Sequence, residues 1–109
     1  VMATFACRHT AARMGEELDI IVDGGACVRD VVVAHPVYGE LRADLMLESR
    51  RDVAAFLRQM EEMAAPPLSL LTDGVHLHTI EAPDDAAVTD IRAALARAGL
   101  LAPPATDEP

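Results

Sequence analysis

The sequence predicts an α+β fold, a four-stranded sheet with three helices on one face in the order β-α-β-β-α-β-α. Two observations lead to this prediction. Apolar and polar residues alternate in several short stretches, and a period of two is typical of strands with one buried face. Three other stretches repeat apolar residues every three or four positions, as amphipathic helices do. With 109 residues, the chain is long enough for one such domain and too short for two.

The first strand and the first helix are predicted near the N-terminus. Alternation from Ala3 to His9 places Phe5 and Cys7 on one face, which makes Cys7 a small core residue rather than a metal ligand. From Thr10 onward an apolar helical stripe follows, which Gly24 and Gly25 end. The stripe consists of Met14, Leu18, Ile21 and Val22.

The middle of the chain predicts two strands and a helix. Val28 to Ala34 contains a β-branched run, and residues 41–47 alternate, so two strands joined around residues 35–39 are expected. Ser49 followed by Asp52 resembles a capping box at the start of a helix. The apolar stripe of that helix is Val53, Phe56, Leu57 and Met60.

The last strand and the last helix follow the break at residues 66–67. Val75 to Ile80 alternates and places His76 and His78 on one face. The final helix is expected to begin with Pro83 at its first position and to end at Gly99. Residues 102–109 are predicted to be a disordered tail.

The net charge and the apolar pattern exclude several classes of function. A formal charge of −9 repels phosphate backbones, so this chain alone is not expected to bind nucleic acid. Apolar runs are far shorter than the roughly 20 residues that a membrane span needs, and no signal peptide is recognisable. Two cysteines without a repeated spacing fit a reducing compartment. We therefore expect a cytoplasmic protein.

A group of histidines and carboxylates suggests a metal site. The rings of His76 and His78 are expected about 7 Å apart at the backbone and on the same side of a strand. His9 ends the first strand, and Glu16 and Glu17 follow on the first helix. Three imidazoles and one carboxylate suit a divalent transition metal. Spacing alone does not choose between the two glutamates, and taken by itself it favours the interpretation in which both are solvated surface acids.

A second group suggests contacts to a small molecule. His35 and Tyr38 lie in the expected bend between the middle strands, where they offer hydrogen bonds and a flat apolar face. Arg50 and Arg51 follow a helix cap, where backbone N–H groups and a guanidinium together can hold a carboxylate. A structural bend and a solvated basic pair are the alternatives. No nucleophile or phosphate-binding motif is recognisable.

Four stretches, taken together, resemble the 3H domain family, and they span nearly the whole chain. The stretches are Ala6-Cys7-Arg8-His9-Thr10, His35-Pro36-Val37-Tyr38-Gly39-Glu40, Ser49-Arg50-Arg51-Asp52-Val53, and Leu71-Thr72-Asp73-Gly74-Val75-His76-Leu77-His78-Thr79-Ile80-Glu81-Ala82-Pro83. The resemblance implies a fold similar to a phosphocarrier domain. It also implies one divalent metal, nickel or zinc, with the ligands His9, Glu17, His76 and His78.

The resemblance further implies a regulatory function. In this family the domain follows a winged helix-turn-helix and is the effector half of a nicotinic-acid-responsive transcriptional repressor of niacin and NAD metabolism. Residues 1–101 would be the 3H domain, the winged helix-turn-helix would be absent from this chain, and nicotinic acid and a second copy would be its partners. The alternatives are a metal-dependent hydrolase, with Glu16, Glu40 or Asp73 as a conceivable base, and a dimerisation module with a structural metal.

Overall fold

A four-stranded antiparallel sheet, in the spatial order β1-β4-β2-β3, is the frame of the molecule. The computed structural model describes residues 1–103. The strands are β1 (Met2–Arg8), β2 (Cys27–His35), β3 (Gly39–Leu47) and β4 (Val75–Glu81). Because β4 lies between β1 and β2, the last strand of the chain occupies the middle of the sheet. The α+β fold class predicted from the sequence is confirmed.

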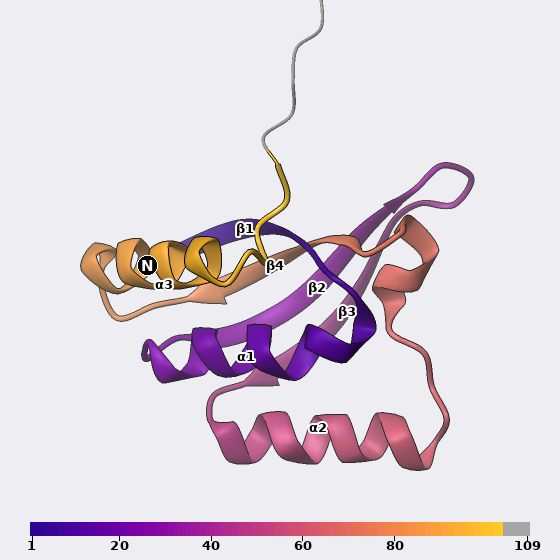
Figure 1. The fold of residues 1–109 in the computed structure, drawn as a ribbon, viewed down its shortest axis with the longest axis horizontal. Helices are drawn as coiled ribbons and strands as arrows, with labels where there is room; N and C mark the ends of the chain where they lie inside the picture. The colour runs from indigo at the N-terminus through magenta and orange to yellow at the C-terminus, as the bar shows by residue number, and fades with distance from the viewer. Residues whose placement is uncertain (104–109) are drawn as a thin grey trace, which may run out of the picture.

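Three helices pack against the sheet, as Figure 1 shows: α1 (Met14–Asp23), α2 (Arg50–Glu62) and α3 (Asp85–Arg97). Helix α1 lies between α2 and α3 and contacts both. The buried side chains of these helices meet the alternate residues of β1, β2 and β4 that point toward them. This core includes Phe5, Leu18, Ile21, Val28, Ile80, Ile91 and Leu95.

Side-chain caps begin two of the helices. The Ser49 hydroxyl accepts a hydrogen bond from the Asp52 amide at 3.1 Å, as the sequence predicts for α2. Asp84 caps α3 by accepting from the Ala87 amide at 2.8 Å. Pro83 was predicted at the first helical position, but it lies before the cap. The prediction for Pro83 is wrong because the Asp84 carboxylate takes the capping role.

Two short 3-10 helices lie near one end of the sheet. The first, η1 (Ala11–Arg13), replaces the expected first turn of α1. The second, η2 (Leu68–Thr72), occupies the segment between α2 and β4, which the sequence indicated only as a break and a turn. Asp73 ends η2 in the left-handed region, with φ of 54°. Both 3-10 helices carry the chain toward the same end of the sheet.

The C-terminal segment covers the outer edge of β1. Arg8 donates its amide to the Leu100 carbonyl, and Ala102 donates to the Ala6 carbonyl, both at 2.9 Å. Leu101 forms an isolated bridge with Cys7. Of the predicted tail at residues 102–109, Ala102 is therefore hydrogen-bonded to β1, and residues 104–109 lie outside the described residues.

A β-bulge interrupts β2 between Val28 and Asp30. Two residues of β2, Arg29 and Asp30, stand opposite Thr79 of β4. The bulge leaves the Asp30 carboxylate buried, where it accepts from the Thr79 amide at 3.0 Å and pairs with Arg42 at 2.9 Å. The local twist of a bulge changes the direction of the groups beside it. The Asp30 carbonyl consequently points to a histidine described below.

Candidate metal centre

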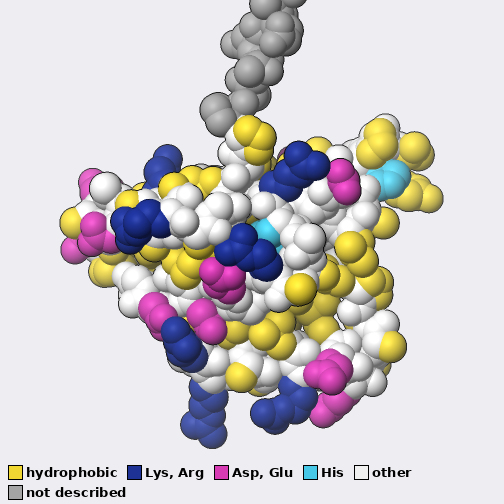
Figure 2. All heavy atoms as spheres, in the orientation of Figure 1, with side chains coloured by type: hydrophobic (Ala, Val, Ile, Leu, Met, Phe, Trp, Pro, Cys, Tyr) yellow, Lys and Arg dark blue, Asp and Glu magenta, His cyan; other side chains and the backbone are white. Residues whose placement is uncertain are grey.

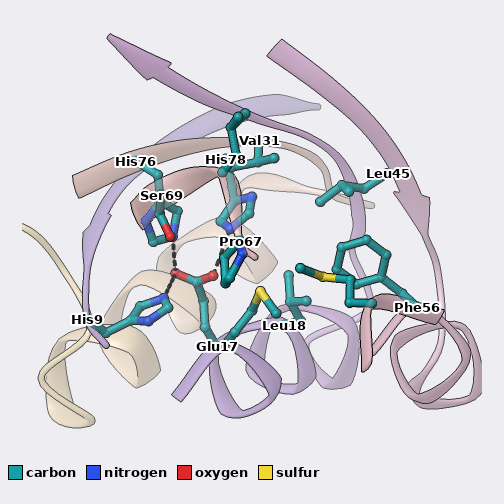
Figure 3. Close-up of a pocket in the computed structure, with 13 residues that line it drawn as sticks. His9, Glu17, Leu18, Val31, Leu45, Phe56, Pro67, Ser69, His76 and His78 are labelled. Atoms are coloured by element: carbon teal, nitrogen blue, oxygen red, sulfur yellow. Dashed lines mark hydrogen bonds and ion pairs between the residues drawn. The ribbon is translucent and has the colours of Figure 1, made fainter. Parts of the chain in front are cut away.

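One buried carboxylate lies at the centre of three histidine rings. Glu17 projects from the first turn of α1, and its side chain is fully buried. Its Oε2 atom lies 2.7 Å from Nε2 of His9 and 2.7 Å from Nε2 of His76. Its Oε1 atom lies 2.7 Å from Nε2 of His78. Figure 3 shows these rings converging on Glu17 from separate segments of the chain.

The fold explains this convergence. Alternation along β4 places the rings of His76 and His78 on the face that the helices cover, with their centroids 4.9 Å apart. His9 directly follows β1, whose last residue, Arg8, pairs with Val75 at the start of β4. Its ring consequently lies 4.8 Å from that of His76. Glu16, one position from Glu17, instead binds Arg13 at 3.0 Å near the surface.

Backbone carbonyls hold the outer nitrogen of each ring. Nδ1 of His9 donates to the Thr10 carbonyl at 2.7 Å, and Nδ1 of His76 donates to the Gly74 carbonyl at 2.8 Å. Nδ1 of His78 donates to the Asp30 carbonyl at 2.8 Å. A carbonyl oxygen only accepts, so these contacts place a proton on every Nδ1. They fix the orientation of all three rings, as hydrogen bonds to the outer nitrogen of a ligating histidine do in metal centres.

Hydrogen bonds from the three histidine rings keep Glu17 ionised. Burial alone would raise its carboxyl pKa, but the contacts with His76, His78 and His9 outweigh burial and lower the pKa below its usual value. For His9, burial acts to lower the pKa, whereas the hydrogen bond to Glu17 raises it, and the net shift is upward. The centre therefore favours positive charge around one carboxylate.

The donor set fits a divalent cation. Each Nε2 faces the Glu17 carboxylate, and an ionised carboxylate only accepts hydrogen bonds. Because Nδ1 is already protonated, each ring needs a second proton on Nε2 to satisfy this contact. Three buried imidazolium ions would then surround a single carboxylate. A divalent ion removes the conflict, since neutral imidazole and carboxylate are the ligands that nickel and zinc accept.

A thiol borders the same centre. Cys7 is fully buried, and its sulfur, a Glu17 oxygen and a His76 nitrogen lie within 4.8 Å of one another. Burial is the main cause that raises the pKa of the Cys7 thiol, and the Glu17 charge adds to it. The sequence indicated a core residue, which agrees with this burial. The neighbourhood of Glu17 could not be predicted, because it depends on the position of α1 over the sheet.

A mostly apolar cavity opens beside the centre, between the sheet, α1, α2 and η2. Figure 3 shows Glu17 and His78 at one end of the cavity and Phe56 at the other. The remaining lining is mainly aliphatic and sulfur-containing: Met14, Leu18, Val31, Leu45, Met60, Pro67, Leu68 and Ser69, with His9 and His76. In the sequence, Met14, Phe56 and Met60 were recognised only as parts of helical apolar stripes.

The four residues that the sequence suggested for a small molecule do not line this cavity. His35 and Tyr38 lie at the tip of the β2–β3 hairpin, with ring centroids 4.7 Å apart. Arg50 pairs with Asp23 at 2.6 Å, and Arg51 is exposed on the first turn of α2. The structure thus separates two groups that the sequence could not place relative to one another.

Comparison with known proteins shows which family this chain belongs to. The profile of the 3H domain matches residues 2–104. The transcription repressor NadR of Bacillus subtilis is 46% identical over 96 residues, which cover 88% of this chain and 53% of the relative. The probable transcription repressor NiaR of Thermotoga maritima is 42% identical over 96 residues, with 88% and 55% covered. The chain thus spans about half the length of these relatives.

Proposed function

Since the chain belongs to the 3H domain family, we propose that it is the sensing part of a transcriptional repressor that controls niacin and NAD metabolism. The regulatory role is supported by the two relatives, whose names are those of repressors. In the whole protein, a DNA-binding region would respond to the state of this domain. The formal net charge of −9 supports the expectation that another region of the whole protein contacts DNA.

The first element of the proposal is one nickel or zinc ion held by His9, Glu17, His76 and His78. The observation that carries it is the orientation of the rings. Every Nδ1 is bound to a carbonyl, and every Nε2 faces the same carboxylate. When bound, the ion supplies a Lewis acid to which a ligand atom can attach. The residues of the chain supply a rigid, buried set of four donor side chains.

The second element is nicotinic acid in the cavity beside the metal centre. A small aromatic acid needs one polar anchor for its carboxylate or ring nitrogen, and apolar walls for its ring. The cavity combines the metal centre with Phe56, Met60 and Leu68. A direct role for His35, Tyr38, Arg50 and Arg51 stays a prediction, and in a single chain these residues lie outside the cavity.

The third element is a homodimer in the cytoplasm. A ligand shifts a regulatory equilibrium only when its affinity for two states of the protein differs. Two states of a dimer would present a pair of DNA-reading helices at different spacings. Among residues 1–103, none of the helices is long and apolar enough to cross a membrane.

A metal-dependent hydrolase is the less favoured alternative. Hydrolysis needs a base beside the metal-bound water. Of the conceivable bases, Glu16 binds Arg13, Glu40 lies beside the hairpin turn, and Asp73 pairs with Arg8 at the surface. None of the three lines the cavity.

Calorimetric titration with nicotinic acid tests the sensor. We expect the zinc-loaded or nickel-loaded chain to bind nicotinic acid, and the chelated chain to bind much more weakly. Nicotinamide, which lacks the carboxylate, is the comparison ligand. Equal binding before and after chelation would contradict the metal's role. Absence of binding by either form would leave a module with a structural metal, and metal-dependent hydrolysis of esters or amides would favour the enzyme.

A further inference from the structure

The two edge strands of the sheet, β1 and β3, differ in the backbone hydrogen bonds on their outer sides. The outer side of β1 is hydrogen-bonded to the segment from Leu100 to Ala102. The outer side of β3 has no strand partner among residues 1–103, since β3 pairs only with β2. It is nine residues long. A long open edge exposes unpaired backbone N–H and C=O groups, which favour the addition of another strand.

The side chains of β3 leave this edge partly apolar. Leu41, Ala43 and Leu45 point to the helix side and are only half-buried. Beside them, a shallow hollow between β3 and α2 is lined by Leu45, Met46, Leu47, Ala55 and Phe56, with Asp52 and Gln59. A strand added to β3 would cover both the open backbone groups and part of this hollow.

The charges on the exposed face of β3 indicate which chain supplies the added strand. Glu40, Arg42 and Asp44 alternate in sign along the exposed face, and the side chains of Arg42 and Asp44 are 61% and 79% exposed. In an antiparallel pair, directly opposite side chains lie on the same face and interact. A second copy with β3 reversed about Ala43 would place Arg42 opposite Asp44 at both ends of the pair.

Other registers are less favourable. Centring on Arg42 or Asp44 would place like charges opposite one another, which is destabilising. Centring on Leu41 would pair Arg42 with Glu40, but the turn at Gly39, where φ is 78°, leaves little strand beyond it. Centring on Ala43 pairs residues 41–45 of each copy and brings Leu41 opposite Leu45. Met46, with φ of 54°, ends the regular strand there.

We propose that β3 is the dimer interface of this domain, and that two copies pair their β3 strands antiparallel about Ala43 into one eight-stranded sheet. This proposal names the surface of the homodimer included in the proposed function and rests on it. The contact is isologous, as a two-fold dimer requires, because the same residues serve both copies. The helices of both copies then lie on the same face of the joined sheet.

Charge exchange across β3 tests the interface. We expect sedimentation equilibrium to show a dimer for the unmodified chain. Arg42→Asp should abolish it, because aspartates then face one another, and Arg42→Asp with Asp44→Arg should restore it. A circular dichroism spectrum and a melting curve for each variant check that the fold is intact. Since Arg42 also pairs with Asp30, the melting curve of Arg42→Asp separates an interface effect from a folding effect: a monomer that melts like the unmodified chain has lost only the interface.

A cysteine at the two-fold axis tests the register. Directly opposite residues have Cβ atoms about 4.5–5.5 Å apart, close to the geometry of a disulfide. Ala43→Cys should form a covalent dimer under mild oxidation. Leu41→Cys should not, because it lies about four residues, roughly 13 Å, from its own copy. The unmodified chain, which keeps Cys7 and Cys27, measures the background level of disulfide cross-linking. Cys7 is buried and Cys27 partly buried.

The outcomes separate this inference from the broader proposal. A dimer that persists in Arg42→Asp and is not cross-linked at residue 43 would overturn the β3 interface, while the homodimer itself would stand. Cross-linking at residue 41 instead would overturn the register. A monomer at all concentrations, with and without zinc or nickel, would overturn both the interface and the homodimer, but not metal or nicotinic acid binding.

Discussion

The candidate metal centre and the β2–β3 hairpin use histidine in opposite ways. In the hairpin, Nδ1 of His35 accepts hydrogen bonds from the amides of Val37 and Tyr38, both at 3.1 Å. In the centre, Nδ1 of each histidine instead donates to a carbonyl. When neutral, a ring whose Nδ1 accepts carries its proton on Nε2, and a ring whose Nδ1 donates leaves Nε2 free. The backbone partner therefore determines which histidine can offer Nε2 to a metal.

The surroundings of the two regions differ as well. The centre is buried among α1, η2 and the sheet. The hairpin tip projects from the body, and Figure 2 shows apolar side chains gathered there. Val37 and Tyr38 are 79% and 74% exposed. Changes in the centre should therefore affect metal binding and stability together, whereas changes in the hairpin should affect neither strongly.

The largest expected effect is the loss of metal after removal of two ligands. His76→Ala with His78→Ala should reduce zinc content from one equivalent to none, because a glutamate and a single histidine cannot hold the ion. His35→Ala is the matched control and should keep one equivalent. Elemental analysis after dialysis measures both. Metal content that stayed at one equivalent in the double variant would show that the site is elsewhere.

Replacing the central carboxylate should have the next largest effect. Glu17→Gln leaves three buried rings without a counter-charge, and breaking a buried ion pair costs about 3–5 kcal/mol. Urea unfolding of the metal-free protein measures this loss. Glu16→Gln, on the exposed side of the same helix, should change the free energy of unfolding by less than about 0.5 kcal/mol. Equal effects of the two variants would contradict a central role for Glu17.

A change of pH is expected to have a smaller effect on the stability of the metal-free protein. The His9 pKa is raised above its usual 6.5, so in the metal-free protein its contribution to stability is complete below that pH and is lost as pH rises through the folded-state pKa. The Glu17 pKa is lowered below its usual 4.5, so its contribution is present above that pH and is lost as pH falls toward the folded-state pKa.

Thermal unfolding of the metal-free and zinc-loaded forms checks this dependence. The metal-free melting temperature should be highest between about pH 4.5 and 6.5 and should fall toward pH 8. The zinc-loaded form should not show the fall at high pH, because the ion takes the place of protons and binds more tightly as they leave. Parallel curves for the two forms would argue against a shared site for protons and metal.

The smallest expected effect is the difference in stability between substitutions of the two cysteines. Cys7→Ser places a hydroxyl in the core and should cost about 1–3 kcal/mol, while zinc content stays at one equivalent. Cys27→Ser, at a partly exposed position, should be nearly neutral. The absorption spectrum of the cobalt-loaded protein is the second measurement. A thiolate-to-cobalt charge-transfer band that disappears in Cys7→Ser would show that Cys7 is a ligand rather than a core residue.

Much of the fold followed from local patterns in the sequence. Period-two alternation correctly placed His76 and His78 on one face of a strand, and Ser49 with Asp52 correctly marked the start of α2. These features depend on neighbours in the sequence. The proximity of His9 to His76 and His78 could be predicted less directly from the sequence, because it requires β1 to lie beside β4 in the sheet.

Other features of the site depend on contacts between distant segments. The choice between Glu16 and Glu17 follows from the start of α1 at Met14 and from its rotation over the sheet, and only the family resemblance indicated Glu17 in advance. The acceptor for His78 is a carbonyl in the bulge of β2, which no local pattern marks. The separation of Tyr38 and Arg50 from the cavity depends equally on tertiary arrangement.

Asp30 connects the candidate metal centre to the open edge of the sheet. Its carbonyl accepts from His78, and its carboxylate pairs with Arg42 on β3. If ion binding at His78 changes the free energy of β3 pairing, thermodynamic reciprocity requires that pairing change the ion affinity by the same factor. Metal affinity would then depend on protein concentration. Dilution alone would weaken ion binding, and the abundance of the protein would itself determine how much metal the site holds.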